Sequence, residues 1–459
     1  MTLPSNIQVN AWANKAVVGP TDATLKSRII GRAVPDHNIY LPVLRSPETD
    51  WFKPDVGWGL VLPDNLEIEP AQRATSVDAP EPIQRLHAAR GGPVFRITRD
   101  WAPGKLGQYT EDGTFIEPII AAGNIGTAPG HIPKYLLIAG SPEQIPWRVQ
   151  YDLQVPFFTG RLDLDENGLR NYVNALLSDW DGMAPNKANT LVWSVDHGKS
   201  DITHWLRRAI GKPLHAKFAN ETDEALNFGA HYLQRSCATH GALTNAIRVR
   251  RPSLIATTSH AETWPLDDPS TMRSNLGLLI DADKTRLDLS DLVENAAPAG
   301  AIWYAHACCS AGATETSAYI DVLQEGTTAH DVVSAVTSCG EVMSPLPRAL
   351  LGAPGPLAGF IGQVEPTFDW TIKHPETGQY LSKAILDCLY QALFTGCPVG
   401  MALEHMRNVL AQVGNSRSIA EEAFRDHPDP SQLGYLLSLT LSAHDWRSVV
   451  LLGDPTVTL

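Results

Sequence analysis

The sequence has no long apolar run, few cysteines and no excess of positive charge. No stretch of about eighteen apolar residues occurs in it, so we expect no membrane-spanning helix. Residues 1–18 are polar and lack the apolar stretch of an export signal. The formal net charge of −14 argues against nucleic acid and anionic membranes as partners, because both would repel an acidic surface.

Cysteine is scarce, and its spacing is not that of a disulfide framework. The 459 residues include 6 cysteines, of which Cys308 and Cys309 are adjacent and the others form no CxxC pair. Such a set predicts neither a network of disulfides nor a zinc site built from spaced ligand pairs. We therefore expect a reducing, cytoplasmic setting with free thiols, and neither a metal nor a cofactor.

The chain divides into two regions of different texture. Residues 1–130 contain 14 of the 34 prolines and only short strand-like pieces, at Asn38–Leu44 and Gly92–Thr98, so we expect an irregular N-terminal or regulatory region. In residues 131–459, buried strands alternate with amphipathic helices, which predicts a three-layer α/β/α domain with a mainly parallel central sheet. The predicted strands are 134–140, 155–160, 190–195, 253–258, 301–307 and 357–361, and the predicted helices are 166–177, 201–210 and 380–393.

Reactive side chains follow two of these strands. His260 comes just after the fourth strand, and Cys308 comes just after the fifth. The carboxyl ends of neighbouring parallel strands meet at one edge of a sheet, so the two side chains would lie close together. An imidazole beside a thiol promotes thiolate formation and can protonate a leaving amine. The ordinary alternative is a buried cysteine beside a loop histidine. We expect His306, on the strand itself, to be packed or hydrogen-bonded.

Seven segments between Tyr135 and the C-terminus together resemble the gingipain-type and CHAT-type cysteine peptidases of the caspase-like fold. Their order along the chain matches that of the family, although Ser141 stands where the family usually has Asp. The resemblance implies a caspase-like three-layer α/β/α fold for residues 131–459. The segments are LLIAGSPEQIP (136–146), FFTGRLDLD (157–165), IATTSHAETW (255–264), WYAHACCSAG (303–312), SCGEVM (338–343), LAGFIGQVEPTFDW (357–370) and VVLLGDPTVTL (449–459).

The resemblance implies a catalytic pair and an oxyanion hole. His260 falls on the catalytic histidine, and Cys308, which follows Ala307, falls on the nucleophile. Cys309 is the alternative nucleophile, because it would put a glycine at the last position of the C-x-x-G motif. The backbone N–H groups of Cys308 and Ala261 would stabilise the oxyanion. The family usually has glycine in place of Ala261, and a positive φ there would cost alanine about 1 kcal/mol.

The segment GKSDITHWLRRAI (198–210) resembles the specificity region of arginine-cleaving gingipains. It assigns Asp201 to the floor of a pocket, where a carboxylate pairs with arginine in a bidentate fork. Asp201 also has the position of a helix N-cap, and one residue can do both. Trp370 would form an aromatic wall of this pocket.

Three further residues near these motifs carry weaker assignments. Asp196 or Glu262 would orient the catalytic histidine, although each also has an ordinary structural reading. His197 precedes a glycine after a strand, but one strand too early in the expected order, so we interpret it as a loop histidine.

The resemblance implies an intracellular endopeptidase that cleaves after Arg, and secondarily Lys, through a thioester acyl-enzyme and without a cofactor. Its partners would be a protein or peptide substrate with a basic residue before the cleaved bond, and an activator or inhibitor protein. The basic segment IRVRR (247–251) is a predicted loop where self-cleavage could occur. Related proteins act in bacterial defence and programmed death. The alternatives are an inactive scaffold, which the alanine at position 261 favours, and a transpeptidase or ligase.

Overall fold

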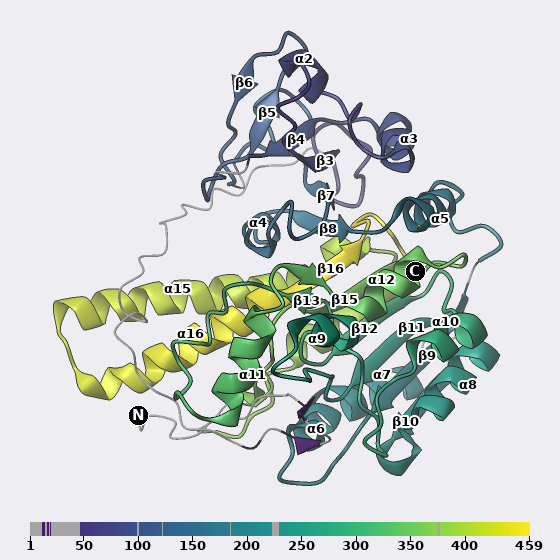
Figure 1. The fold of residues 1–459 in the computed structure, drawn as a ribbon, viewed down its shortest axis with the longest axis vertical. Coiled ribbons are helices and arrows are strands. Elements are labelled where there is room, and N and C mark those ends of the chain that lie inside the picture. Colours follow the sequence, from purple (N-terminus) through teal and green to yellow (C-terminus); the bar gives the residue numbers. More distant parts are fainter. Residues whose placement is uncertain are drawn as a thin grey trace.

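The structure is a computed structural model, and it describes residues 12–13, 16–17, 19, 46–98, 101–121, 123–183, 185–222, 229–373 and 377–459. Its centre is a mainly parallel sheet of 12 strands, covered by helices (Figure 1). The predicted α/β class with a mainly parallel sheet is therefore confirmed. Within the described ranges, no helix is long and apolar enough to cross a membrane. The predicted strand at Asn38–Leu44 lies outside the described residues.

The strand order of the sheet is β10-β9-β11-β12-β15-β16-β8-β7-β3-β4-β5-β6. Neighbouring strands are parallel except at β15–β16, β4–β5 and β5–β6. The strands are β3 (Trp58–Pro63), β4 (Val94–Ile97), β5 (Gly107–Tyr109), β6 (Phe115–Ile116), β7 (Tyr135–Ala139), β8 (Phe158–Leu162), β9 (Asn186–Ser194), β10 (Gly229–Gln234), β11 (Pro252–Thr258), β12 (Ile302–His306), β15 (Gly359–Gln363) and β16 (Val449–Gly453).

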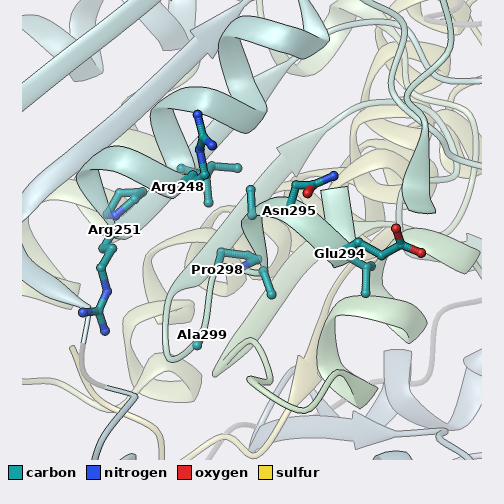
Figure 2. Close-up of a pocket in the computed structure, with 11 residues that line it drawn as sticks. Arg248, Arg251, Glu294, Asn295, Pro298 and Ala299 are labelled. Atoms are coloured by element: carbon teal, nitrogen blue, oxygen red, sulfur yellow. The ribbon is translucent and has the colours of Figure 1, made fainter. Parts of the chain in front are cut away.

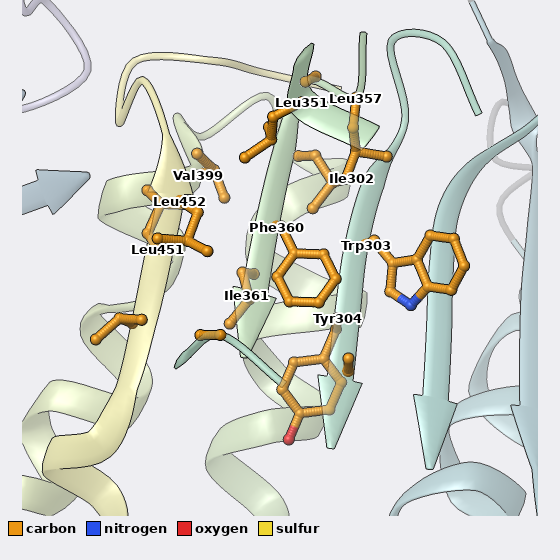
Figure 3. Close-up of a cluster of buried hydrophobic side chains, with 14 of the residues drawn as sticks. Ile302, Trp303, Tyr304, Leu351, Leu357, Phe360, Ile361, Val399, Leu451 and Leu452 are labelled. Atoms are coloured by element: carbon orange, nitrogen blue, oxygen red, sulfur yellow. The ribbon is translucent and has the colours of Figure 1, made fainter. Parts of the chain in front are cut away.

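The central strands are apolar along most of their length because both faces of the sheet are covered. Every residue of β7, β11, β12, β15 and β16 is buried. Figure 3 shows the packing between neighbouring strands, with Trp303 and Tyr304 from β12 beside Phe360 and Ile361 from β15. The six predicted strands all exist, with ends that differ from the predictions by a few residues.

The N-terminal region is more regular than its composition suggested. Strand β3 pairs in parallel with β7, so that Trp58 lies opposite Tyr135, and β4, β5 and β6 extend the same sheet (Figure 1). The sheet therefore continues across the predicted boundary between residues 130 and 131. The prolines and glycines of this region lie mostly in the connections between its strands. Of these strands, β4 coincides with the strand-like piece predicted at Gly92–Thr98, whereas β3 gains its pairing partly from the more distant β7.

Helices pack in two layers. The first consists of α3 (Glu81–Arg90), α5 (Glu166–Leu177), α12 (Pro345–Gly352), α10 (Leu289–Ala296) and α8 (His240–Arg250). The second consists of α7 (Lys212–Ala219), α13 (Lys383–Leu386), the π-helical η5 (Asp387–Ala392), α15 (Glu404–Asp426) and α16 (Leu433–Ser448), of which the last two form a projecting antiparallel pair at the left of Figure 1.

One sequence expectation fails in the first helical layer. The basic segment 247–251 was predicted as a loop open to self-cleavage, but its first four residues form the end of α8, and Arg251 is the C-cap. The segment is helical because α8 packs one face, which includes the buried Leu243 and Ile247, against the rest of the protein. A peptidase binds its substrate in an extended form, so cleavage here would first require unwinding of the helix.

Candidate active site

The candidate residues lie at the carboxyl ends of four adjacent strands. β9, β11, β12 and β15 are neighbours in this order and run parallel. One register row joins Ser194, Thr258 and His306, so the segments that follow these residues leave the sheet at the same edge. They carry Asp201, His260 and Cys308, and β15 adds Thr367.

Asp201 joins the first two of these loops. It is the N-cap of α6 (Ile202–Leu206), and its Oδ1 accepts hydrogen bonds from the backbone N–H of Thr203 at 2.8 Å and from its hydroxyl at 2.5 Å. Both carboxylate oxygens lie 3.1 Å from Nε2 of His260. Burial alone would raise the pKa of Asp201, but the contacts with His260 and Thr203 outweigh it and lower the pKa to about 2. The carboxylate is therefore ionised, and hydrogen bonds from Thr203 and His260 hold it in place.

His260 is completely buried, and its two nitrogens have different surroundings. A carboxylate oxygen only accepts hydrogen bonds, so Nε2 carries a proton that it donates to Asp201. Nδ1 is buried without a hydrogen-bond partner among the described residues. In the neutral ring this nitrogen bears a lone pair, which makes it the one available for proton exchange.

Cys308 lies directly after β12, and its side chain is enclosed. The backbone N–H of Thr367 donates to Sγ at 3.3 Å, and the hydroxyl of Thr367 lies 4.0 Å from the same sulfur. Burial raises the pKa of this thiol far above its usual range, and the contacts with Thr367 offset only part of that effect. The thiol is thus protonated in this closed arrangement.

Cys309 forms a tight turn after Cys308. Its φ is +53°, its N–H donates to the carbonyl of Glu365 at 3.2 Å, and its carbonyl accepts from the hydroxyl of Ser344 at 2.6 Å. Burial also raises the pKa of the Cys309 thiol. Both cysteine side chains are fully buried, so burial does not decide between the two candidate nucleophiles.

Ala261 fits its position without backbone strain. It is absent from the described non-glycine residues with positive φ. The flanking residues hold it in an extended pairing, because the carbonyl of His260 accepts from Ile280 N–H at 3.0 Å and the N–H of Glu262 donates to Leu278 at 2.8 Å. The cost that alanine would incur at a positive φ therefore does not arise here.

Asp201 is the carboxylate that contacts His260, a role that the sequence gave to Asp196 or Glu262. Asp196 instead pairs with Arg207 at 2.7 Å and with Nδ1 of His204 at 3.2 Å. Burial raises the pKa of Glu262, and no hydrogen bond from its side chain to His260 is found among the described residues. The sequence pattern located Asp201 as a helix N-cap, which the structure has, but could not show its contact with His260 from the neighbouring strand.

Trp370 lies in the short 3-10 helix η4 (Asp369–Thr371). The structure does not describe its side chain, so the predicted pocket wall lies outside the described part of the site.

His306 agrees with its sequence interpretation. Its Nδ1 lies 2.8 Å from the hydroxyl of Tyr304, and burial lowers the pKa of the ring to about 3.

Near the N-terminus, Trp12 packs against the candidate site, a contact that the sequence did not specify. Trp12 belongs to β1 (Trp12–Ala13), and its ring centroid lies 5.4 Å from that of His197 and 5.6 Å from that of His260. Its carbonyl accepts hydrogen bonds from the backbone N–H and the hydroxyl of Thr263. The Trp12 side chain is 2 % exposed, so it seals one side of the imidazole.

The clearest pockets of the described residues lie away from this site. The pocket in Figure 2, of about 260 Å³, is found at the amino ends of β11 and β12, between α8 and α10. Another, of about 360 Å³, lies between α7 and α13. Arg248, Glu294 and Asn295 line the first without forming a catalytic arrangement. Cys308 itself is fully buried, so its access requires the residues that enclose it to move.

Comparisons with protein-family models, with curated proteins and with solved structures found no match for this chain.

Proposed function

We propose that this chain is a cysteine endopeptidase of the caspase-like fold, with Cys308 as nucleophile and His260 as its acid–base partner, and that it cleaves after a basic residue. The observation that carries the proposal is the contact between Asp201 and His260 Nε2 at 3.1 Å, which leaves Nδ1 without a partner among the described residues. His260 follows β11 and Cys308 follows the neighbouring parallel strand β12. A nucleophile, a base and a group that orients the base are the parts that thiol catalysis requires.

Each group has a defined task in this mechanism. His260 takes the proton of Cys308 on Nδ1, while Asp201 holds the ring and stabilises the imidazolium. The sulfur attacks the carbonyl carbon of the peptide bond, and the N–H groups of Cys308 and Ala261 stabilise the oxyanion. The imidazolium then gives its proton to the departing amine. Water hydrolyses the thioester and regenerates the thiol.

The closed site is consistent with a latent enzyme. A peptidase that cleaves after basic residues inside the cytoplasm must be restrained, and Trp12 covers the imidazole of the proposed dyad. Displacement of Trp12 together with the residues that enclose Cys308 would hydrate the thiol and lower its pKa towards the range in which thiolate forms. An activator protein or a processing event would provide this displacement. The six cysteines are unpaired, in keeping with a cytoplasmic location.

The basic preference depends on Asp201, which now has two roles to fill. Its Oδ1 is occupied by Thr203, whereas its Oδ2 accepts only from His260 among the contacts described. A carboxylate has about four acceptor sites, so Oδ2 retains capacity for a guanidinium. The preference is the part of the proposal that a substrate panel tests by itself.

The second candidate function is an inactive scaffold, and the burial of both thiols favours it.

An assay of peptide cleavage distinguishes the two candidate functions. Fluorogenic peptides ending in Arg, Lys, Asp or Leu are incubated with the full chain and with Cys308→Ala, before and after limited proteolysis of the N-terminal segment. We expect cleavage after Arg and Lys that Cys308→Ala abolishes. Preference for Asp or Leu would overturn the specificity, and no cleavage in any state would favour the scaffold. Product analysis with an added amine nucleophile separates hydrolysis from ligation.

A further inference from the structure

His197, Asp201 and His260 form a cluster, and the proposed peptide cleavage gives a role to Asp201 and His260 but none to His197. One ligand atom of each side chain lies within 4.8 Å of those of the other two. His197 and Asp201 come from the loop after β9, and His260 comes from the loop after β11. The rings of the two histidines are 5.8 Å apart and nearly parallel, at 14°.

The hydrogen bonds of His197 fix which of its nitrogens is free. Its Nε2 lies 3.0 Å from the backbone carbonyl of Asp281, and a carbonyl only accepts, so Nε2 carries the proton. Its Nδ1 therefore bears a lone pair, and this atom is buried without a hydrogen-bond partner among the described residues. A histidine whose second nitrogen donates to a carbonyl is the arrangement found around metal ions.

The other two side chains have suitable spacing and support. His260 Nε2 lies 3.1 Å from the carboxylate of Asp201, and tetrahedral zinc bonds of about 2.0–2.1 Å place two ligand atoms roughly 3.3 Å apart. The backbone and hydroxyl of Thr203 orient Asp201 through Oδ1 and leave Oδ2 directed to the cluster. Trp12 covers both imidazoles, which limits access of water on that side.

We propose that His197 Nδ1, Asp201 Oδ2 and His260 Nε2 bind a divalent transition-metal ion, with zinc the best match to two imidazoles and one carboxylate. Binding uses the other tautomer of His260: the proton leaves Nε2 and is carried on Nδ1, and the lone pair freed on Nε2 binds the metal. Three protein ligands leave one coordination position for water. The site itself does not depend on the proposed peptidase activity.

The consequence for catalysis rests on the proposed function. When the metal occupies Nε2, the neutral imidazole carries its remaining proton on Nδ1 and cannot accept another from Cys308. Zinc would then hold the peptidase in an inactive form, and a chelator would release it. The closed arrangement under Trp12 would be the form with the higher metal affinity, because the ligands are already gathered there.

The test measures metal binding directly, with the full-length chain stripped by a chelator and titrated with Zn²⁺ against a chromophoric competitor. We expect one tight site, weakened by more than about tenfold in His197→Ala and in His197→Gln, which keeps a polar side chain but removes the imidazole. His215→Ala is the matched control, since His215 also has a buried, unpartnered Nδ1 among the described residues but lies outside the cluster. It should bind zinc as the wild type does.

Cobalt identifies the ligands, because the chain also has free thiols that bind zinc. Co²⁺ should give visible d–d bands without the near-ultraviolet charge-transfer band of a thiolate ligand. Equal affinity in wild type and both His197 variants, or a thiolate band that these variants retain, would overturn the site. Zinc binding in a chain that cleaves no peptide would leave the site intact and reject the peptidase, so the two failures are distinguishable.

Discussion

The carboxylate of Asp201 lies 3.1 Å from Nε2 of His260, although the two residues are 59 positions apart in the chain. The contact exists because β9 and β11 are adjacent and parallel, so the loops that follow them meet at one edge of the sheet. It defines the orientation of the imidazole and the identity of its free nitrogen.

Asp201→Asn should lower kcat for every cleavable peptide by on the order of 10²-fold or more, because the ring loses its orienting carboxylate. KM for peptides with a basic residue before the cleaved bond should rise as well, because a neutral amide cannot pair with that residue as a carboxylate does. Steady-state kinetics with arginine and lysine peptides measures both. Asp196→Asn is the control, since Asp196 pairs with Arg207 and not with the catalytic ring, and its kcat should stay near that of the wild type. Loss of arginine preference at unchanged kcat would instead assign Asp201 to the pocket alone.

Trp12→Ala should open the site. Removing the indole uncovers one side of His260, and reaction of Cys308 with iodoacetamide should become several-fold faster. Peptide mass spectrometry after timed alkylation gives the rate at each cysteine. Trp12→Phe keeps a ring in place and should react nearly as slowly as the wild type. Identical rates in all three proteins would show that the segment does not limit access.

Gly277→Ala should disturb the turn that carries the nucleophile. A Cβ on Gly277, whose φ is +73°, would lie 2.3 Å from the carbonyl oxygen of Cys309. We expect a loss of about 1–3 kcal/mol in the free energy of unfolding, measured in urea, together with slower labelling of Cys308. Gly241→Ala, in helix α8 with nothing within 4 Å of the added carbon, should instead be neutral or stabilise by up to about 1 kcal/mol. Equal effects of the two substitutions would contradict the close contact.

Asp445 should make stability depend on pH. Burial raises its pKa to about 7, and nearby Glu365 adds to the effect, while the hydrogen bonds of Thr371 and Tyr319 oppose it. The folded protein then holds a proton that the unfolded chain releases above about pH 4. Stability contributed by this group therefore falls between about pH 4 and pH 7, by at most about 1.4 kcal/mol per pH unit.

Asp445→Asn should remove this component. The difference in unfolding free energy between the variant and the wild type should shift in favour of the variant as the pH rises from 4 to 7. Urea titrations at four pH values measure it. A difference that is constant with pH would mean that Asp445 has the same pKa in both states.

The sequence predicted the secondary structure best where a strand is buried on both faces or where a helix has local start signals. Apolar runs such as 253–258 and 301–307 predicted β11 and β12 almost residue for residue, because a strand covered on both faces is apolar along most of its length. The edge shared by His260 and Cys308 followed from the parallel arrangement. The helix at 166–177 was correct because its acidic N-cap and apolar spacing are local signals.

The features that the sequence did not predict depend on contacts between segments far apart in the chain. Strand β3 is held by β7, more than seventy residues later, and no local pattern in a proline-rich region reveals such a partner. The contact of Trp12 with His260 has the same origin. Asp201 was found as a helix cap, yet its contact with His260 emerges only when the two loops are set side by side.

The most direct test of the account is covalent labelling with a peptidyl-arginine electrophile, read by mass spectrometry of the intact chain and its peptides. We predict a single adduct on Cys308 in the Trp12→Ala protein, absent from the matching Cys308→Ala variant and retained with Cys309→Ala. An adduct on Cys309, or no adduct in any of these proteins, would contradict the assignment of Cys308 as the nucleophile.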